Sequence, residues 1–216
     1  MNLVLLSNFT NNNHPHLQEK IRTFVKGRSP KLGYIPSQLD KEKKYFQKSK
    51  VYFDELGFKE YVYFDVDEDY DERAKRELVN CDVVYLSGGN TFYFLKNLQK
   101  RNIIPLIKEM VHAGKLLIGL SAGSIMMSET IKMAELIDKN EVELDNLKAL
   151  HLVEFEFMPH WEEHFSLDEL MIYSKAMNKK IYTCQDGDGI VVTDHKVEVY
   201  GQIHEINAGN IKKHLT

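Results

Sequence analysis

The chain alternates short apolar runs with longer amphipathic segments over its first two thirds. Five runs have the composition of buried strands: Leu3–Leu6, Leu32–Ile35, Tyr61–Phe64, Val83–Leu86 and Leu116–Leu120. The segments between them, such as His16–Lys26 and Leu39–Leu56, carry apolar residues at helical spacing. Such alternation produces βαβ crossovers, and strands that are apolar on both faces are covered by helices on both faces. The sequence therefore predicts an α/β fold with a mostly parallel sheet flanked by helices on both faces.

The pattern changes after Ser128. Short runs that predict strands are Thr130–Ala134, Phe155–Met158, Ile181–Cys184, Gly189–Thr193 and Val197–Gln202. Helical spacing is found at Leu167–Met177 and, over a shorter stretch, at Ala208–His214. The turn residues at Asp186–Gly189 and Thr193–Lys196 are typical of hairpins. We expect the sheet to end in antiparallel edge strands near the C-terminus. Because no repeat or linker interrupts the chain, we expect one domain over residues 1–216.

Composition excludes several classes of protein. The 216 residues include 28 Lys plus Arg against 32 Asp plus Glu, and this balance argues against nucleic-acid binding. The longest weakly polar stretch, Leu116–Met127, is too short to span a membrane. Cys81 and Cys184 lie too far apart for a CxxC motif and fit a reducing compartment. No secretory signal is visible, so we expect a cytoplasmic protein.

The sharpest motif is Gly119-Leu120-Ser121-Ala122-Gly123, a G-x-S-x-G directly after an apolar run. Small residues around a serine allow a tight strand-to-helix turn that exposes the hydroxyl, and the next backbone N–H, on Ala122, can face a developing oxyanion. The motif therefore predicts a nucleophile elbow. The alternative is an ordinary glycine-rich turn in which Ser121 caps the following helix.

A second polar loop, Ser87-Gly88-Gly89-Asn90-Thr91, also follows an apolar run and precedes a helix, Phe92–Gln99. Its glycines can expose backbone N–H groups, and Asn90 or Thr91 can cap the helix. Alone, this loop is most simply a turn with a cap. Beside a nucleophile elbow it can supply the second oxyanion donor, because the carboxyl ends of parallel strands meet at one edge of the sheet.

A serine nucleophile needs a general base, and His160 is the best placed of the nine histidines. It follows the alternating run Phe155–Met158 and Pro159, so it is expected at a strand terminus. The same histidine begins His160-Trp161-Glu162-Glu163-His164, which matches the H-x-x-E-H zinc pattern. No third metal ligand is evident, so we favour the serine chemistry and expect no metal site.

Three blocks together resemble the peptidase E (aspartyl dipeptidase) family of serine peptidases: Gly88–Phe92, Gly119–Gly123 and Pro159-His160. The resemblance covers nearly the whole chain. It implies a fold similar to class I glutamine amidotransferases, with Ser121 as nucleophile and His160 as base. It also implies oxyanion donors at Gly89 and Ala122 and no cofactor. We expect the rest of the loop, Gly88, Asn90 and Thr91, to contact substrate.

The family also implies an acidic residue in the segment that follows the serine. Here Leu136 falls at the corresponding place, flanked by Glu135 and Asp138. We assign Glu135, because it directly follows the predicted strand Thr130–Ala134 and a carboxylate must orient the imidazole. Asp138 is the alternative.

These observations predict a serine hydrolase that cleaves short peptides, with dipeptides bearing N-terminal Asp as the substrates that the resemblance implies. An esterase or amidase, a cyanophycinase-like hydrolase with the same triad, and an inactive binding protein remain as alternatives. We expect a monomer or homodimer with a small peptide as its partner. Recognition of an aspartyl side chain requires a cation, and the sequence does not rank Arg101, Lys132 and Lys26.

Overall fold

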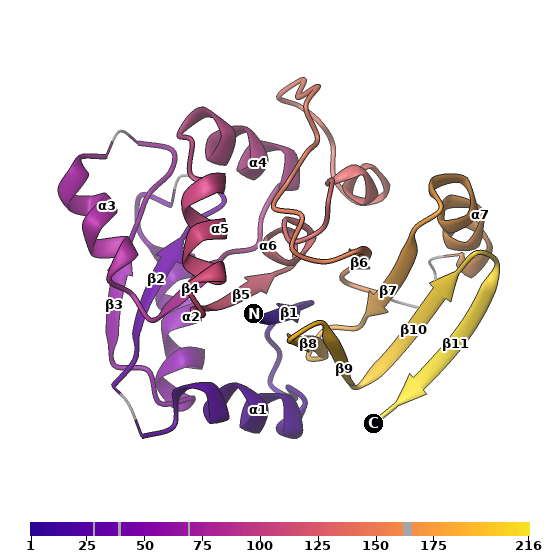
Figure 1. Cartoon of the computed structure of the whole chain (residues 1–216), viewed down its shortest axis with the longest axis horizontal. Coiled ribbons are helices and arrows are strands. Elements are labelled where there is room, and N and C mark those ends of the chain that lie inside the picture. Colours follow the sequence, from indigo (N-terminus) through magenta and orange to yellow (C-terminus); the bar gives the residue numbers. More distant parts are fainter. Residues whose placement is uncertain (28, 39, 69, 162–165) are drawn as a thin grey trace.

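The computed structural model describes the whole chain except residues 28, 39, 69 and 162–165. Two sheets organise the described residues (Figure 1). The larger has the strand order β3-β2-β4-β5-β1-β8-β9 and the smaller β11-β10-β7-β6. Strands of the larger sheet are β1 (Asn2–Leu6), β2 (Lys31–Ile35), β3 (Glu60–Tyr63), β4 (Val83–Leu86), β5 (Leu116–Leu120), β8 (Gly189–Thr193) and β9 (Lys196–Tyr200). Strands of the smaller sheet are β6 (Phe155–Met158), β7 (Lys180–Cys184), β10 (Gln202–Asn207) and β11 (Asn210–Leu215).

Helices cover both faces of the larger sheet. They are α1 (Pro15–Val25), α2 (Lys44–Glu55), α3 (Glu72–Val79), α4 (Thr91–Lys100), α5 (Ile104–His112) and the short α6 (Ala122–Ile125). Successive side chains of a strand point to opposite faces, and β1 shows the result: Leu3 and Leu5 join the core with α4 and α5, whereas Val4 and Leu6 pack with α1 and α2. The predicted fold class, a mostly parallel sheet between two layers of helices, is confirmed (Figure 1).

The C-terminal third forms a second sheet instead of only extending the first. β8 pairs antiparallel with β1 and with β9, as expected for edge strands. β6 and β7 pair parallel to each other, and β10 and β11 complete the smaller sheet in antiparallel register. Helix α7 (Leu167–Met177) packs on this sheet through a small apolar cluster that includes Leu170 and Ile206. The two sheets bring the carboxyl ends of β1, β5, β6 and β7 together.

Two predicted elements are wrong. Thr130–Ala134 is not a strand: Thr130 makes one isolated bridge, and the 3₁₀ helix η1 (Lys132–Leu136) follows, because Ile131, Met133 and Ala134 all turn into the core. Ala208–His214 is not a helix. Ala208 and Gly209 both have positive φ and form a two-residue hairpin turn between β10 and β11.

Glu156 is a buried carboxyl in β6, with a side chain only 3% exposed. Burial raises its pKa to about 7, although a hydrogen bond with the backbone of Met133 opposes the effect. Its Oε2 has no hydrogen-bond partner among the described residues. Because the folded state holds this proton more tightly than the unfolded chain, the group stabilises the fold fully below about pH 4.5 and loses that contribution as the pH rises through about 7.

We therefore expect the free energy of unfolding to fall by up to about 3 kcal/mol between pH 4.5 and 8, and Glu156→Gln to remove most of that fall. Urea unfolding at several pH values measures both. Glu154→Gln is the matched control, since the Glu154 side chain is 84% exposed. Parallel stability curves for wild type and Glu156→Gln would contradict the assignment.

Candidate active site

Ser121 occupies the sharp turn between β5 and α6. Its φ of 50° and ψ of −111° are costly for a residue with a Cβ, and such strain persists only where the surroundings hold it in place. Its N–H donates to the carbonyl of Leu6 at 2.9 Å, and Ser124 Oγ donates to the same oxygen at 2.8 Å. At Gly123 any Cβ would collide with the carbonyl of Leu86. The G-x-S-x-G sequence is thus what lets this turn pack against β4 and β1.

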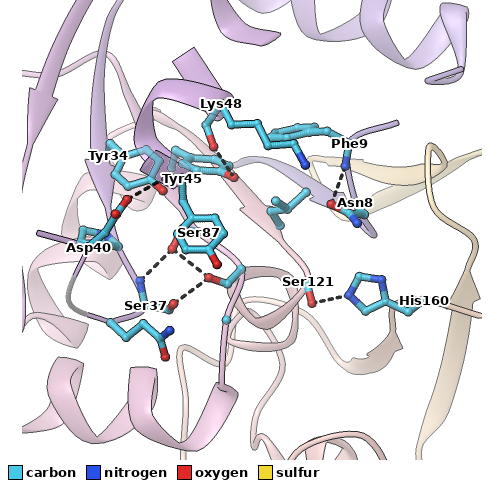
Figure 2. Close-up of a pocket in the computed structure, with 17 residues that line it drawn as sticks. Asn8, Phe9, Tyr34, Ser37, Asp40, Tyr45, Lys48, Ser87, Ser121 and His160 are labelled. Carbon is cyan, nitrogen blue, oxygen red and sulfur yellow. Dashed lines mark hydrogen bonds between the residues drawn. The ribbon is translucent and has the colours of Figure 1, made fainter. Parts of the chain in front are cut away.

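His160 faces this serine from the end of β6. Ser121 Oγ lies 2.8 Å from His160 Nε2, and His160 Nδ1 lies 2.7 Å from Asp186 Oδ1 (Figure 2 shows the first of these contacts). His160 has a positive φ of 55°, which turns the chain sharply just after Pro159. Asp186 follows β7, the parallel neighbour of β6, so the two side chains leave adjacent strand ends. The three groups form a hydrogen-bonded Ser–His–Asp line.

The electrostatics of Asp186 fix the direction of these hydrogen bonds. Partial burial alone raises the pKa of the carboxyl, but hydrogen bonds from Asn8 and Ser7 and the neighbouring His160 outweigh it and hold the pKa below its usual range. An ionised carboxylate can only accept, so Nδ1 of His160 carries the proton. Nε2 is then free to accept from the Ser121 hydroxyl. This is the tautomer that a general base beside a serine requires.

The structure corrects our choice of carboxylate. Glu135 lies on η1 with an exposed side chain, near Tyr173 and not against the imidazole. Asp138 accepts hydrogen bonds through Oδ2 from the N–H and hydroxyl of Thr91, so it binds the first turn of α4. The physical reason is that the segment after Ser128 folds into η1 and turns toward α4 and α7. Asp186 contacts His160 instead.

The loop after β4 approaches Ser121 at Gly88. A Cβ on Gly88 would lie 3.5 Å from Cβ of Ser121, and one on Gly89, whose φ is +141°, would collide with Ser37 Oγ. The other two predicted contact residues are used differently. Asn90 caps α4 by accepting from the N–H of Tyr93, and Thr91 is fully buried against Asp138. Gly88 and Gly89 therefore face the site, whereas the side chains of Asn90 and Thr91 stabilise the helix behind it.

A cavity of about 330 Å³ opens beside Ser121 (Figure 2). Its described lining comes from α2, from the last residues of β2, β4 and β5, from the loops after β1, β2 and β4, and from the two catalytic candidates: Asn8, Phe9, Tyr34, Pro36, Ser37, Gln38, Asp40, Tyr45, Lys48, Ser49, Tyr85, Ser87, Gly88, Gly89, Leu120, Ser121 and His160. Burial raises the pKa of Tyr34 to about 12 and that of Tyr85 as well. Both phenols thus stay neutral hydroxyl groups at physiological pH.

Lys48 is the one lysine or arginine among the described residues that line this cavity. It is exposed on α2, one turn after Tyr45, and lies at the rim near Phe9 (Figure 2). Asp40, the carboxylate of the lining, accepts hydrogen bonds from the backbone N–H groups of Lys44 and Tyr45, so it caps α2. None of Arg101, Lys132 and Lys26 is in the lining. Arg101 instead donates to the backbone carbonyls of Val66 and Asp67.

Within the described ranges, no group of three or more His, Cys, Asp or Glu side chains is arranged to hold a metal ion. The H-x-x-E-H alternative depends on Glu163 and His164, which lie outside the described residues. His160 itself is engaged with Ser121 and Asp186. Nor does any described helix have the length and apolar character needed to cross a bilayer.

Comparison with known proteins decides the family. The model of peptidase family S51 matches residues 3–200, nearly the full chain. The chain belongs to peptidase family S51. The family resemblance inferred from the sequence is thereby confirmed.

Curated relatives of the chain are named as peptidases. An uncharacterized peptidase of Listeria monocytogenes is 33% identical over 120 residues, and the match spans 54% of this chain and 58% of that protein. Peptidase E of a Nostoc species is 29% identical over 165 residues, spanning 74% of this chain and 65% of the relative. The matched segments thus cover less than two thirds of these relatives.

Two crystal structures share the S51 fold over longer stretches. A protein from Listeria monocytogenes EGD-e that is assigned to peptidase E superposes with a TM-score of 0.74 at 27% identity, covering 92% of this chain and 96% of that one. A peptidase from an acI-B1 actinobacterium gives a TM-score of 0.69 at 18% identity and covers 100% of this chain and 94% of its own. The second likeness concerns the fold alone.

Asp186 is the one member of the Ser–His–Asp line that the sequence did not indicate. Our interpretation of Asp186–Gly189 as a hairpin turn used its glycines and left the first aspartate without a role. A signal was present, because Asp186 follows the apolar run Ile181–Cys184 just as His160 follows Phe155–Met158. Polar residues after two parallel strands meet at one edge of a sheet. That β6 and β7 are such a pair becomes visible only in the structure.

Proposed function

We propose that this S51 chain is a serine peptidase that cleaves short peptides through an acyl-enzyme on Ser121. The observation that carries the proposal is the line from Ser121 Oγ to His160 Nε2, 2.8 Å, and from His160 Nδ1 to Asp186, 2.7 Å. A serine hydroxyl is a poor nucleophile until a neighbour accepts its proton, and this arrangement supplies that neighbour in the required tautomer.

The reaction follows from these positions. Ser121 Oγ attacks the scissile carbonyl carbon while its proton moves to His160 Nε2, and Asp186 stabilises the imidazolium that forms. The N–H groups of Gly89 and Ala122 are our proposed donors to the oxyanion. His160 then gives the proton to the leaving amine as the C–N bond breaks. Water then loses a proton to His160 as it attacks the resulting ester, and His160 returns that proton to Ser121 Oγ as the ester bond to the enzyme breaks.

The position of His160 also orients the substrate. Figure 2 shows His160 on one side of Ser121, and Ser37, Ser87 and Tyr34 of the cavity on the other. The leaving amine must lie toward the histidine that protonates it, so the acyl residue lies toward the cavity. We propose that an N-terminal aspartyl residue binds there with its side-chain carboxylate at Lys48. The relatives named peptidase E and the charge of Lys48 support this preference.

A dipeptide panel of Asp-X, Glu-X and Ala-X tests the proposal. We expect Asp-X to be the best substrate, and Lys48→Gln to lower kcat/KM for Asp-X about 10- to 100-fold, the usual worth of a charge-assisted hydrogen bond. Ala-X turnover should not change. The matched control is Lys44→Gln, which removes an exposed lysine of α2 outside the described lining.

Two outcomes would count against the proposal. Equal rates with Asp-X and Ala-X, unaffected by Lys48→Gln, would remove the aspartyl preference. Hydrolysis of simple esters without cleavage of any peptide would favour the esterase alternative.

A further inference from the structure

Ser7 stands directly after β1, is fully buried, and touches two members of the Ser–His–Asp line at once. Its Oγ accepts a hydrogen bond from the backbone N–H of His160 at 2.7 Å and donates one to Asp186 Oδ1 at 2.9 Å. The Oδ1 atom that receives the Ser7 hydroxyl is the one that faces His160 Nδ1. One hydroxyl therefore connects the backbone of the base with the carboxylate that orients it.

We propose that Ser7 is a positioning residue that keeps His160 and Asp186 aligned with Ser121. This inference rests on the proposed function and deepens it. Ser121 follows β5 of the larger sheet, whereas His160 and Asp186 follow strands of the smaller one. Any shift between the sheets would separate nucleophile and base. Ser7 directly follows β1 of the larger sheet and binds His160 and Asp186, which follow strands of the smaller sheet, so it fixes the distance on which proton transfer depends.

The surroundings of Ser7 support this role. Leu6, its neighbour in β1, accepts the Ser121 N–H, so consecutive residues hold the nucleophile and the base. His160 has a positive φ, and a residue in that conformation persists only where contacts enforce it. The Ser7 hydroxyl receives the N–H of that same residue. Asn8 adds a second hydrogen bond to Asp186, from Nδ2 to Oδ2 at 3.1 Å, which leaves Ser7 as the contact shared with His160.

The test compares Ser7→Ala with Ser128→Ala. Ser128 is also a buried serine, and its hydroxyl donates to the carbonyl of Phe155 at the opposite end of β6, at 2.9 Å. Ser7→Ala removes the hydrogen bonds with His160 and Asp186, whereas Ser128→Ala removes the one with Phe155, and only Ser7 touches the triad. We expect Ser7→Ala to lower kcat about 10- to 100-fold with KM within about threefold, and Ser128→Ala to leave both unchanged.

Proton NMR tests the positioning role of Ser7 independently of turnover. The Nδ1 proton of His160, shared with Asp186, should give a low-field proton resonance in wild type and in Ser128→Ala, and that resonance should broaden or vanish in Ser7→Ala. Should Ser7→Ala not fold, Ser7→Cys fills the same space with a weakly hydrogen-bonding thiol and should show the same loss.

Each outcome has one meaning. A Ser7→Ala protein with wild-type kcat and an intact Nδ1 resonance would overturn the positioning role. Loss of the resonance in both alanine variants would overturn it too, because the effect would then be a general weakening of β6. The two proposals can also fail separately. If the wild type cleaves no peptide, the proposed function is contradicted, but loss of the His160 Nδ1 resonance in Ser7→Ala would still support the positioning role.

Discussion

Replacing Ser121 by alanine is expected to lower kcat about 10⁵- to 10⁶-fold, the loss that removal of a catalytic serine produces when the remaining groups cannot substitute for it. KM should stay within about threefold, because most of the described cavity lining comes from α2 and from the ends of β2 and β4 with the loops after β1, β2 and β4. The measurement is steady-state hydrolysis of the best dipeptide. Covalent labelling by a fluorophosphonate should modify wild type and disappear in the variant.

His160→Ala and the double variant provide the control for this experiment. Nucleophile and base act as one unit, joined by the 2.8 Å contact, so each single variant and the double variant should lose nearly the same factor. Additive losses, or a Ser121→Ala protein that keeps more than about 1% of wild-type turnover, would show that another group carries the chemistry. No labelling of the wild type under any condition would instead favour a binding protein that has kept the fold.

Much of the fold could be predicted from the sequence, because buried strands have a distinctive apolar pattern. The strands of the parallel sheet are continuous apolar runs, and β1, β2, β4 and β5 coincide with the predicted runs to within a residue. The sharp turn at Ser121 could be predicted for a local reason, since such a turn needs small residues at fixed positions. The position of His160 at the end of a strand could be predicted because Pro159 ends the apolar run before it. These signals depend only on residues near one another in the chain.

The carboxylate that contacts His160 could not be predicted, because its position depends on residues far apart in the chain. Our choice of Glu135 depended on a strand at Thr130–Ala134, where the chain instead forms η1 to bury Met133 and Ala134. The contact between His160 and Asp186 depends on parallel pairing of β6 with β7 in a separate sheet. Strand pairing is a long-range property that one sequence does not encode locally. The hairpin between β10 and β11 was missed similarly, because Ala208-Gly209 is a weak turn signal.

Asp186→Asn is expected to lower kcat by about 10⁴, the loss that follows when the base is left in the wrong tautomer. The asparagine keeps the shape of the side chain but can present its N–H₂ group to His160. The imidazole then protonates on Nε2 and no longer accepts the Ser121 proton. Because the asparagine keeps the volume of the side chain and its oxygen can still accept the hydrogen bond from Asn8, the fold should be retained. Turnover of the best dipeptide and thermal unfolding measure the two effects.

Glu135→Gln and Asp138→Asn are the matched controls, because each neutralises one of the carboxylates that the sequence had suggested. Glu135→Gln should leave kcat unchanged, since the side chain is exposed on η1. Asp138→Asn should cost about 1 kcal/mol of stability, because Asp138 binds the N–H and hydroxyl of Thr91 at the start of α4, with little change in kcat. A hundredfold loss in either control, with Asp186→Asn still active, would mean that the loop after η1 moves toward His160 when substrate binds. The carboxylate that orients the base would then be one that only the bound state brings into contact.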